Sequence, residues 1–264
     1  MTITEVKSAL KRLIWLVILV YLAAFIPLAS AERLEDDTLM TFYDDTIFFG
    51  DSQMESLRRY IFSMRETDED FMKKTKLICV GGIGLYAASR NYLSGAFLFS
   101  YAGVELTMFE AAEKFHPKRV FILLGLNDEV GVKVDKAITW VEDILRRMEE
   151  MAPDTEVYFF SETPVTEKYE IKENLKDYQK ALDRYNAALK ETCEQNGAFY
   201  IEIAETFKDE NNYLSSEYSG DKECHLSEAG NALLIQKLKD YAQERYDLGL
   251  WDPFAGETGT AGGK

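Results

Sequence analysis

The chain contains the segment Thr46-Ile47-Phe48-Phe49-Gly50-Asp51-Ser52, in which β-branched and aromatic residues run into a glycine and two polar residues. The apolar run predicts a strand that is buried on both faces, as strands of a parallel sheet are. Gly50 and Asp51 favour a turn where this strand ends. Apolar residues between Met54 and Met64 then recur at helical spacing, so Ser52 is predicted to lie at a strand-to-helix turn.

The same kind of apolar run recurs along the rest of the chain. Four further runs are Leu77–Val80, Val120–Leu124, Val157–Phe160 and Phe199–Ile203. Helical patterns lie between or after them, at Val134–Met151, Asn174–Asn196 and Ser227–Tyr246. Strands that alternate with helices predict right-handed crossovers and an α/β fold with an open parallel sheet of five strands.

Small and polar residues follow each of the first four runs directly. They are Gly50–Ser52, Gly81–Gly84, Gly125–Asp128 and Ser161–Thr163. Ligands of open α/β sheets bind outside the carboxyl ends of the strands. We therefore expect these four segments to gather at one edge of the sheet and to form the functional site there.

The first 31 residues have the pattern of a targeting segment. Lys7, Lys11 and Arg12 precede an uncharged run from Leu13 to Ala29, and Ala29-Ser30-Ala31 has small residues at the positions that signal peptidase prefers. We interpret residues 1–31 as a signal peptide or an uncleaved N-terminal membrane anchor. Residues 32–248 are then one domain that is secreted or held at the cell envelope, outside the cytoplasm, and 249–264 a disordered tail rich in Gly and Thr.

Charge and cysteine content exclude several functions. The chain has 46 acidic and 30 basic residues and a net charge of −16. Such a surface repels nucleic acid and anionic lipid, so we expect no nucleic-acid partner and membrane contact only through an uncleaved N-terminal segment. Cys79, Cys193 and Cys224 are too few for a disulfide framework, and their spacing matches no zinc site, so no metal is expected.

Ser52, His225 and Asp221 are candidates for nucleophilic catalysis. A serine hydroxyl needs a base that takes its proton, and His225, before the last predicted helix, is placed to reach Ser52. The other histidine, His116, precedes a strand and belongs to the opposite edge. Asp221 is the candidate acid that orients the imidazole, with Glu223 as the alternative.

The reaction also needs donors for the oxyanion. Asn127 offers a side-chain amide, and Gly84 or Gly82 a backbone N–H. Cys224, beside His225, is a second candidate nucleophile. Gly82 and Gly84 follow the second predicted strand and Asn127 follows the third, so all three are expected at the same edge of the sheet.

These blocks together resemble the SGNH hydrolases, also called GDSL esterases and lipases. The matching segments are Gly50-Asp51-Ser52, the glycines after the second strand, Gly125-Leu126-Asn127-Asp128 and Asp221 to Ser227. The resemblance implies a flavodoxin-like three-layer α/β/α fold, ester hydrolysis through an acyl-enzyme, and no metal or organic cofactor. By position it also implies that Ser52 is the nucleophile, His225 the base and Asp221 the acid. The oxyanion hole is then formed by the backbone N–H groups of Ser52 and Gly84 and the side chain of Asn127.

The chain departs from the family pattern at three places. Gln53 stands where the family usually has leucine, and Lys222 occupies the usual place of the acid, three residues before His225. The segment Gly81–Gly84 also contains more than one candidate oxyanion donor.

The sequence leaves the substrate and two alternative functions open. Short acyl esters, acetyl groups on carbohydrates above all, suit an exported member of this family, and Tyr86, Tyr92, Phe97 and Tyr101 are candidates for a substrate-binding wall. The displaced acid also allows a degenerate hydrolase that serves as a surface-binding protein. The motif Gly82–Ala87 matches G-x-G-x-x-A of dinucleotide-binding proteins, but it follows the second run rather than the first.

Overall fold

The computed structural model describes residues 33–90, 99–101, 103–128 and 134–255. The predicted targeting segment 1–31 lies outside these ranges, as do Tyr92 and Phe97. The fold is that of the unit that begins at Glu35. Within the described ranges, no helix has both the length and the apolar character that crossing a membrane requires.

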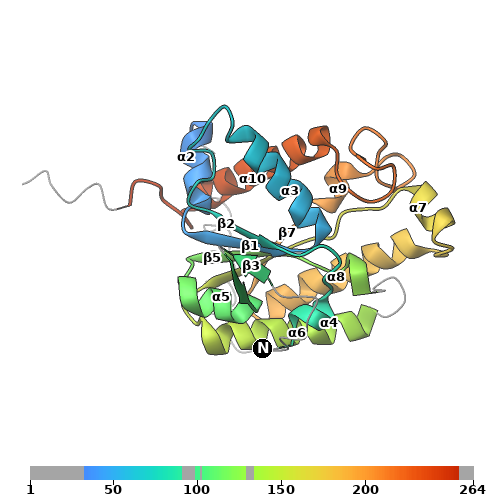
Figure 1. Cartoon of the computed structure of the whole chain (residues 1–264), viewed down its shortest axis with the longest axis horizontal. Helices are drawn as coiled ribbons and strands as arrows, with labels where there is room; N and C mark the ends of the chain where they lie inside the picture. Colours follow the sequence, from blue (N-terminus) through green and yellow to red (C-terminus); the bar gives the residue numbers. More distant parts are fainter. Residues whose placement is uncertain (1–32, 91–98, 102, 129–133, 256–264) are drawn as a thin grey trace, which may run out of the picture. The chain divides into compact units, whose positions relative to one another are not determined.

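A sheet of five parallel strands forms the centre of this unit (Figure 1). Its strands are β1 (Thr46–Gly50), β2 (Lys76–Cys79), β5 (Arg119–Leu123), β6 (Glu156–Phe160) and β7 (Phe199–Ile201). They lie in the order β2-β1-β5-β6-β7, and every neighbouring pair is parallel. Counted along the chain this is the order 2-1-3-4-5 of flavodoxin-like folds, so the predicted fold class is confirmed.

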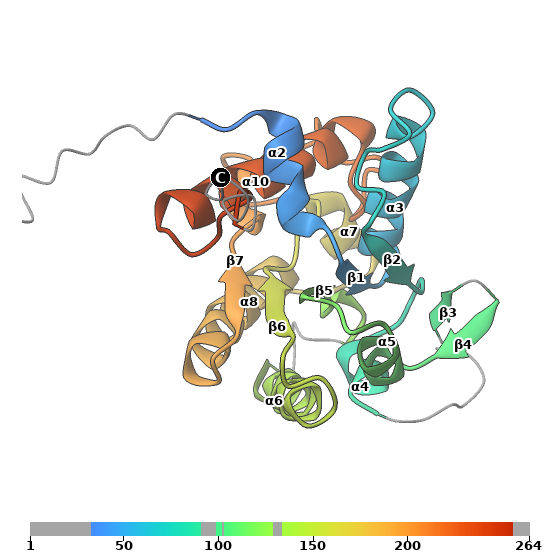
Figure 2. The ribbon, with the colours of Figure 1, turned by 90° about the vertical axis from the view of Figure 1, so that its left-hand side faces the viewer.

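Helices cover both faces of the sheet, as the end-on view in Figure 2 shows. One layer contains α2 (Asp36–Met40), α3 (Ser52–Met64) and α10 (Glu228–Asp247). The other layer contains α4 (Leu85–Ala88), α5 (Met108–Phe115), α6 (Val134–Met151) and α8 (Tyr178–Gln195). Short helices in the connections are η1 (Thr41–Tyr43), η2 (Leu126–Asp128), α7 (Glu167–Lys172) and α9 (Ala204–Phe207).

Burial on both faces explains why the strands are apolar throughout. On one face, Phe48, Phe121 and Tyr158 occupy neighbouring positions in the register of β1, β5 and β6, and their rings stack at centroid distances of 4.7 Å. On the other face, Phe49 and Ile122 belong to the core that also contains the buried residues of α5, α6 and α8. The strands are therefore fixed in register by side chains on both sides.

Of the three long helices predicted, one has the predicted bounds and two begin later than predicted. The α6 helix spans the predicted range. The α8 helix begins at Tyr178, later than predicted, because Asn174 and Asp177 adopt left-handed conformations with φ of 53° and 59°. Ser227 caps α10, since its hydroxyl accepts a hydrogen bond from the backbone N–H of Gly230.

Two regions were not predicted in their observed form. A small antiparallel hairpin, β3 (Phe99–Tyr101) and β4 (Val104–Leu106), packs beside β2. In the predicted tail, residues 249–255 are described, and the ring of Trp251 packs edge-on against Phe42 at 5.2 Å. The placed part of the chain therefore extends past 248 to Ala255, while 256–264 lie outside the described residues.

Candidate active site

Ser52 is the first residue of α3, directly after the turn that ends β1. Asp51 caps this helix, because its Oδ1 accepts a hydrogen bond of 2.9 Å from the backbone N–H of Gln53. Gly50 is needed in this turn, since a Cβ there would lie 2.7 Å from the carbonyl oxygen of Leu123 on β5. The backbone N–H of Ser52 therefore lies at the positive end of the α3 dipole, where a developing anion is stabilised.

His225 lies in the loop before α10, and its Nε2 is 2.8 Å from Oγ of Ser52. The structure therefore brings together two residues that are 173 positions apart in the chain. His116 instead ends α5, with φ of 44°, and is followed by the amino end of β5. It lies at the opposite edge of the sheet, as the sequence predicts.

Asp221 is the carboxylate that contacts His225, with 2.5 Å between its Oδ2 and the Nδ1 of the ring. Its Oδ1 accepts hydrogen bonds of 2.7–3.2 Å from the backbone N–H groups of Glu223, Cys224 and His225. Partial burial acts to raise the pKa of Asp221, but the hydrogen bonds from His225 and the backbone outweigh it and hold the pKa below its ordinary value. Asp221 is therefore ionised at neutral pH.

The alternative acid, Glu223, is engaged elsewhere. Both of its carboxylate oxygens accept hydrogen bonds from Nζ of Lys172, at 2.8 and 3.0 Å. Between the two acids, Lys222 adopts a left-handed conformation with φ of 63°. This turn brings Asp221 back to the imidazole although it stands one position further from His225 than is usual in the family.

Two side chains of α3 fasten the histidine loop to the helix that carries Ser52. Gln53 is buried, and its Nε2 donates a hydrogen bond of 2.5 Å to the carbonyl oxygen of Cys224. The hydroxyl of Ser56 donates to the carbonyl oxygen of Leu226 at 3.2 Å, and Asn231 of α10 donates to the same hydroxyl. These bonds set the position of His225 relative to Ser52.

The candidate oxyanion donors lie at the same edge of the sheet. Nδ2 of Asn127 donates hydrogen bonds to Oδ2 of Asp51 at 2.7 Å and to the carbonyl oxygen of Ile83 at 3.1 Å. Gly84 follows Ile83 and is the N-cap of α4, where a Cβ would lie 2.6 Å from Cγ of Asp128. Gly84 therefore directly follows the residue whose carbonyl oxygen Asn127 contacts, whereas Gly82 precedes that residue.

The structure also explains why Gly84 has no side chain. The Asp128 carboxylate occupies that space and accepts hydrogen bonds from the backbone N–H groups of Leu85 and Tyr86. The helix that follows, α4, has four residues. This is unlike the long helix that begins at a dinucleotide-binding glycine motif, so the structure does not support the nucleotide alternative.

Two further carboxyl groups are buried beneath the site. Asp51 is fully buried, and desolvation raises its pKa to about 7, with the hydrogen bond from Gln53 acting in the opposite direction. Glu162, directly after β6, is 1 % exposed, and burial together with Asp51 and Asp128 raises its pKa well above 4.5. Neither of its carboxyl oxygens has a hydrogen-bond partner within the described residues. The sequence placed Ser161–Thr163 at this edge but did not single out Glu162.

Cys224 is not placed to act as a nucleophile. Its side chain is buried, and desolvation, followed by the charge of Asp221, raises its pKa to about 12. The thiol is therefore protonated at neutral pH and has little nucleophilic character.

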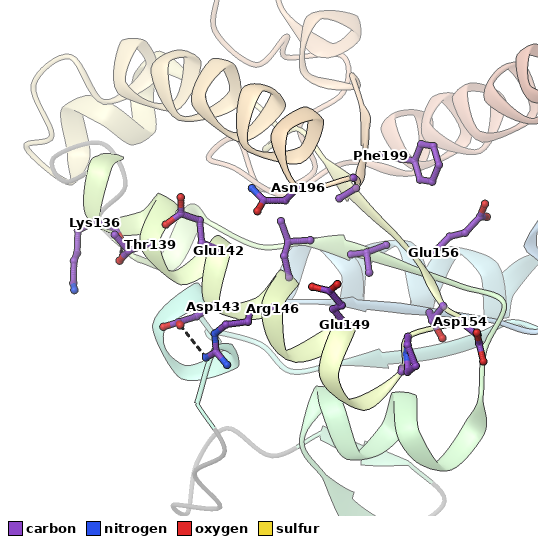
Figure 3. A pocket seen from close by; sticks show the side chains of 17 residues that line it. Lys136, Thr139, Glu142, Asp143, Arg146, Glu149, Asp154, Glu156, Asn196 and Phe199 are labelled. Atoms are coloured by element: carbon purple, nitrogen blue, oxygen red, sulfur yellow. Dashed lines mark hydrogen bonds and ion pairs between the residues drawn. The ribbon is translucent and has the colours of Figure 1, made fainter.

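One cavity of the described residues is lined by none of the candidate catalytic residues. It has a volume of about 970 Å³ and is bounded by α6, by the segment that enters β6, and by the turn before β7 (Figure 3). Carboxylates dominate its labelled side chains, and Asp143 is paired with Arg146. No serine, cysteine or histidine lines this cavity, so it has no counterpart of the pair Ser52 and His225.

The chain matches the model of the GDSL-like lipase/acylhydrolase family over residues 91–233. The matched range includes Asn127, Asp221 and His225 and begins after Ser52. A search among curated proteins found no match.

Solved structures of similar fold include three from bacteria. A Streptococcus pneumonia protein named for platelet activating factor is 22% identical, with 83% of this chain and 99% of that chain covered and a TM-score of 0.55. A GDSL-like lipase from Bacteroides thetaiotaomicron is 15% identical, with 83% and 94% covered and a TM-score of 0.55. A catalytic mutant of an acetylxylan esterase from Geobacillus stearothermophilus is 10% identical, with 75% and 94% covered and a TM-score of 0.54. At these identities the similarity establishes the fold.

Proposed function

The chain belongs to the GDSL-like lipase/acylhydrolase family, and we propose that it is a serine esterase that cleaves carboxylic esters through an acyl-enzyme on Ser52. The observation that carries the proposal is the continuous hydrogen-bond chain from Ser52 through His225 to Asp221, with distances of 2.8 and 2.5 Å. Nucleophile, base and orienting acid in this order are the arrangement that activates a serine hydroxyl.

The first half of the reaction forms the acyl-enzyme. Asp221 accepts a hydrogen bond from the Nδ1–H of His225, so the tautomer with a free lone pair on Nε2 is favoured. Nε2 takes the proton of Ser52 as Oγ attacks the ester carbonyl, and the imidazolium that forms is stabilised by Asp221. The same proton is then given to the leaving alcohol.

The oxyanion forms at the amino end of α3. We assign its donors as the backbone N–H of Ser52, the backbone N–H of Gly84 and the amide of Asn127. Nδ2 of Asn127 donates one hydrogen bond to Oδ2 of Asp51 at 2.7 Å, which orients the amide. Its longer hydrogen bond, to the carbonyl oxygen of Ile83 at 3.1 Å, is the one that an oxyanion would replace. Donors fixed in advance in this way lower the barrier without reorganising during the reaction.

The second half regenerates the enzyme. Water replaces the alcohol beside His225, which removes a proton from the water as it attacks the acyl group on Ser52. The carboxylic acid leaves when the serine recovers its proton from the imidazolium.

We further propose short acyl groups, acetyl above all, on carbohydrate alcohols as the substrate. An acetylxylan esterase is among the proteins of similar fold. Tyr86, two residues after Gly84, is 51 % exposed, and its ring packs against that of Trp140 at a centroid distance of 5.3 Å. The two rings offer an aromatic surface close to the oxyanion donors. Export through residues 1–31 would place the enzyme where such esters occur outside the cytoplasm.

The alternative of a degenerate binding protein rested on the displaced acid. The contact between Asp221 and His225 supports the esterase instead, because the acid reaches the imidazole despite the displacement. An activity assay separates the two functions directly.

The test compares hydrolysis of p-nitrophenyl acetate with acetate release from a panel of acetylated glycans. We expect Ser52→Ala and His225→Ala to lose nearly all activity on both. Matched controls are Ser63→Ala, an exposed serine on the same helix, and His116→Asn, which keeps a residue that tolerates the left-handed conformation. Folded wild-type protein that hydrolyses none of these esters would contradict the proposal, and so would full activity in Ser52→Ala.

A further inference from the structure

The buried thiol beside the candidate base has no role in the reaction described above. Sγ of Cys224 is 3.8 Å from Nδ1 of His225, the same ring nitrogen that contacts Asp221. The sulfur, the ring nitrogen and a carboxylate oxygen of these three residues all lie within 4.8 Å of one another. Among the residues that the structure describes, this is the one such group of three metal-ligating side chains.

The spacing is close to that of ligands around a tetrahedral cation. Bonds of about 2.3 Å to sulfur and 2.0 Å to nitrogen place neighbouring ligand atoms roughly 3.5 Å apart. The Sγ–Nδ1 distance of 3.8 Å needs almost no change. Asp221 would have to move its Oδ2 outward by about 1 Å, and its side chain is 36 % exposed, so solvent leaves room for that movement.

The chemistry of the three atoms selects the cation. A thiolate and an imidazole favour soft or borderline metals such as Zn²⁺ and Cd²⁺ over Mg²⁺ or Ca²⁺. The exposed side of Asp221 and His225 leaves the fourth position to water.

We propose that Asp221, Cys224 and His225 form an inhibitory site for a thiophilic divalent cation, of which Zn²⁺ and Cd²⁺ are representatives. Binding replaces the thiol proton, which goes to solvent, and the Nδ1 proton, which moves to Nε2. With the metal on Nδ1, the neutral imidazole carries its proton on Nε2 and cannot accept one from Ser52. The cation also takes Asp221 away from the ring, so both functions of the acid–base pair are lost in one event.

The test uses the purified full chain and Cd²⁺ as the probe, without reductants that bind the metal. Binding is followed by the ultraviolet charge-transfer absorption of the cadmium–thiolate bond, and inhibition by hydrolysis of p-nitrophenyl acetate. Cys224→Ala is compared with Cys79→Ala and Cys193→Ala, which remove the other two buried thiols. Cys224→Ser is a second variant that keeps the side-chain size.

We expect wild type, Cys79→Ala and Cys193→Ala to show the absorption band and inhibition with the same midpoint. Both Cys224 variants should lose the band, and their inhibition midpoint should rise by at least about 10-fold, the usual scale for loss of a supporting group at a metal site. Equal inhibition of wild type and Cys224→Ala would overturn the proposal, as would the absence of a band in the wild type.

Only the inhibition readout rests on the proposed esterase function. A protein that shows the Cys224-dependent band but hydrolyses no ester would retain the cation site and refute the esterase. An active enzyme that shows no band would support the esterase and overturn the cation site.

Discussion

Asp221 and Glu223 lie two residues apart on one loop, yet only Asp221 reaches His225, because Lys222 between them adopts a left-handed conformation. The sequence left the choice between the two acids open. Residue spacing alone does not reveal which of two nearby carboxylates a turn will direct at the imidazole.

Asp221→Asn should therefore lower kcat by as much as about 10⁴-fold, because an amide cannot stabilise the imidazolium and favours the wrong tautomer of His225. The matched variant is Glu223→Gln, which loses only an ion pair with the half-exposed Lys172 and should keep nearly the wild-type kcat. Steady-state hydrolysis of p-nitrophenyl acetate measures both. A larger loss in Glu223→Gln than in Asp221→Asn would show that the acid is assigned wrongly.

Glu162 carries a second prediction at the scale of single residues. Its pKa in the folded state is raised by burial, so the folded state holds this proton more tightly than the unfolded chain does. The stabilisation is complete below the ordinary pKa of 4.5 and is lost as the pH rises from there toward the raised value. At neutral pH the unfolded chain releases this proton, whereas the buried carboxyl of the folded protein resists ionisation. Glu162 therefore lowers the free energy of unfolding at neutral pH.

Glu162→Gln cannot lose a proton, so it lacks this pH dependence. We expect the Tm of Glu162→Gln minus that of the wild type to become more positive as the pH is raised from about 4 through neutrality. Calorimetric scans across this range measure it. A difference that stays constant with pH would contradict the assignment of a raised pKa.

The link between α3 and the loop before α10 makes a prediction at the scale of elements. Gln53 supplies the donor for the buried carbonyl oxygen of Cys224, and leucine, the residue usual in the family, has no donor. Gln53→Leu should destabilise the protein by about 1–3 kcal/mol, because a buried carbonyl loses its partner. The loosened His225 should also lower kcat by about 10- to 100-fold, with a smaller effect on KM.

Gln236→Leu, at an exposed position on α10, is the matched control and should change neither quantity. Chemical denaturation and steady-state kinetics provide the two measurements. If Gln53→Leu lowers stability but leaves kcat unchanged, the contact is structural and does not position His225.

At the same scale, the sequence predicted the elements that have strong patterns. The five apolar runs correspond to the five parallel strands, and α6 spans the predicted range, because these elements are buried and their side chains repeat with a clear period. The hairpin Phe99–Leu106 escaped prediction because each strand has three residues and Val104 is exposed. Such short strands are fixed by packing on β2 and α5, which local sequence does not report.

At the scale of the whole molecule, the sheet order brings distant segments together. With β1 between β2 and β5, the turns after these three strands are neighbours, and Ser52, Gly84 and Asn127 meet at one edge. That gathering was predictable from the rule for carboxyl ends of parallel strands. The contacts of Gln53 and Glu162 were not, because they depend on how the interior packs around buried polar groups.

The central claim is that Ser52 is the nucleophile activated by His225, and covalent labelling tests it most directly. After incubation with a fluorophosphonate, mass spectrometry of the digested protein should find the adduct on the peptide that contains Ser52. Labelling should disappear in Ser52→Ala and His225→Ala and persist in Ser63→Ala. Correctly folded wild-type protein that remains unlabelled, or that carries the adduct at another residue, would contradict the account.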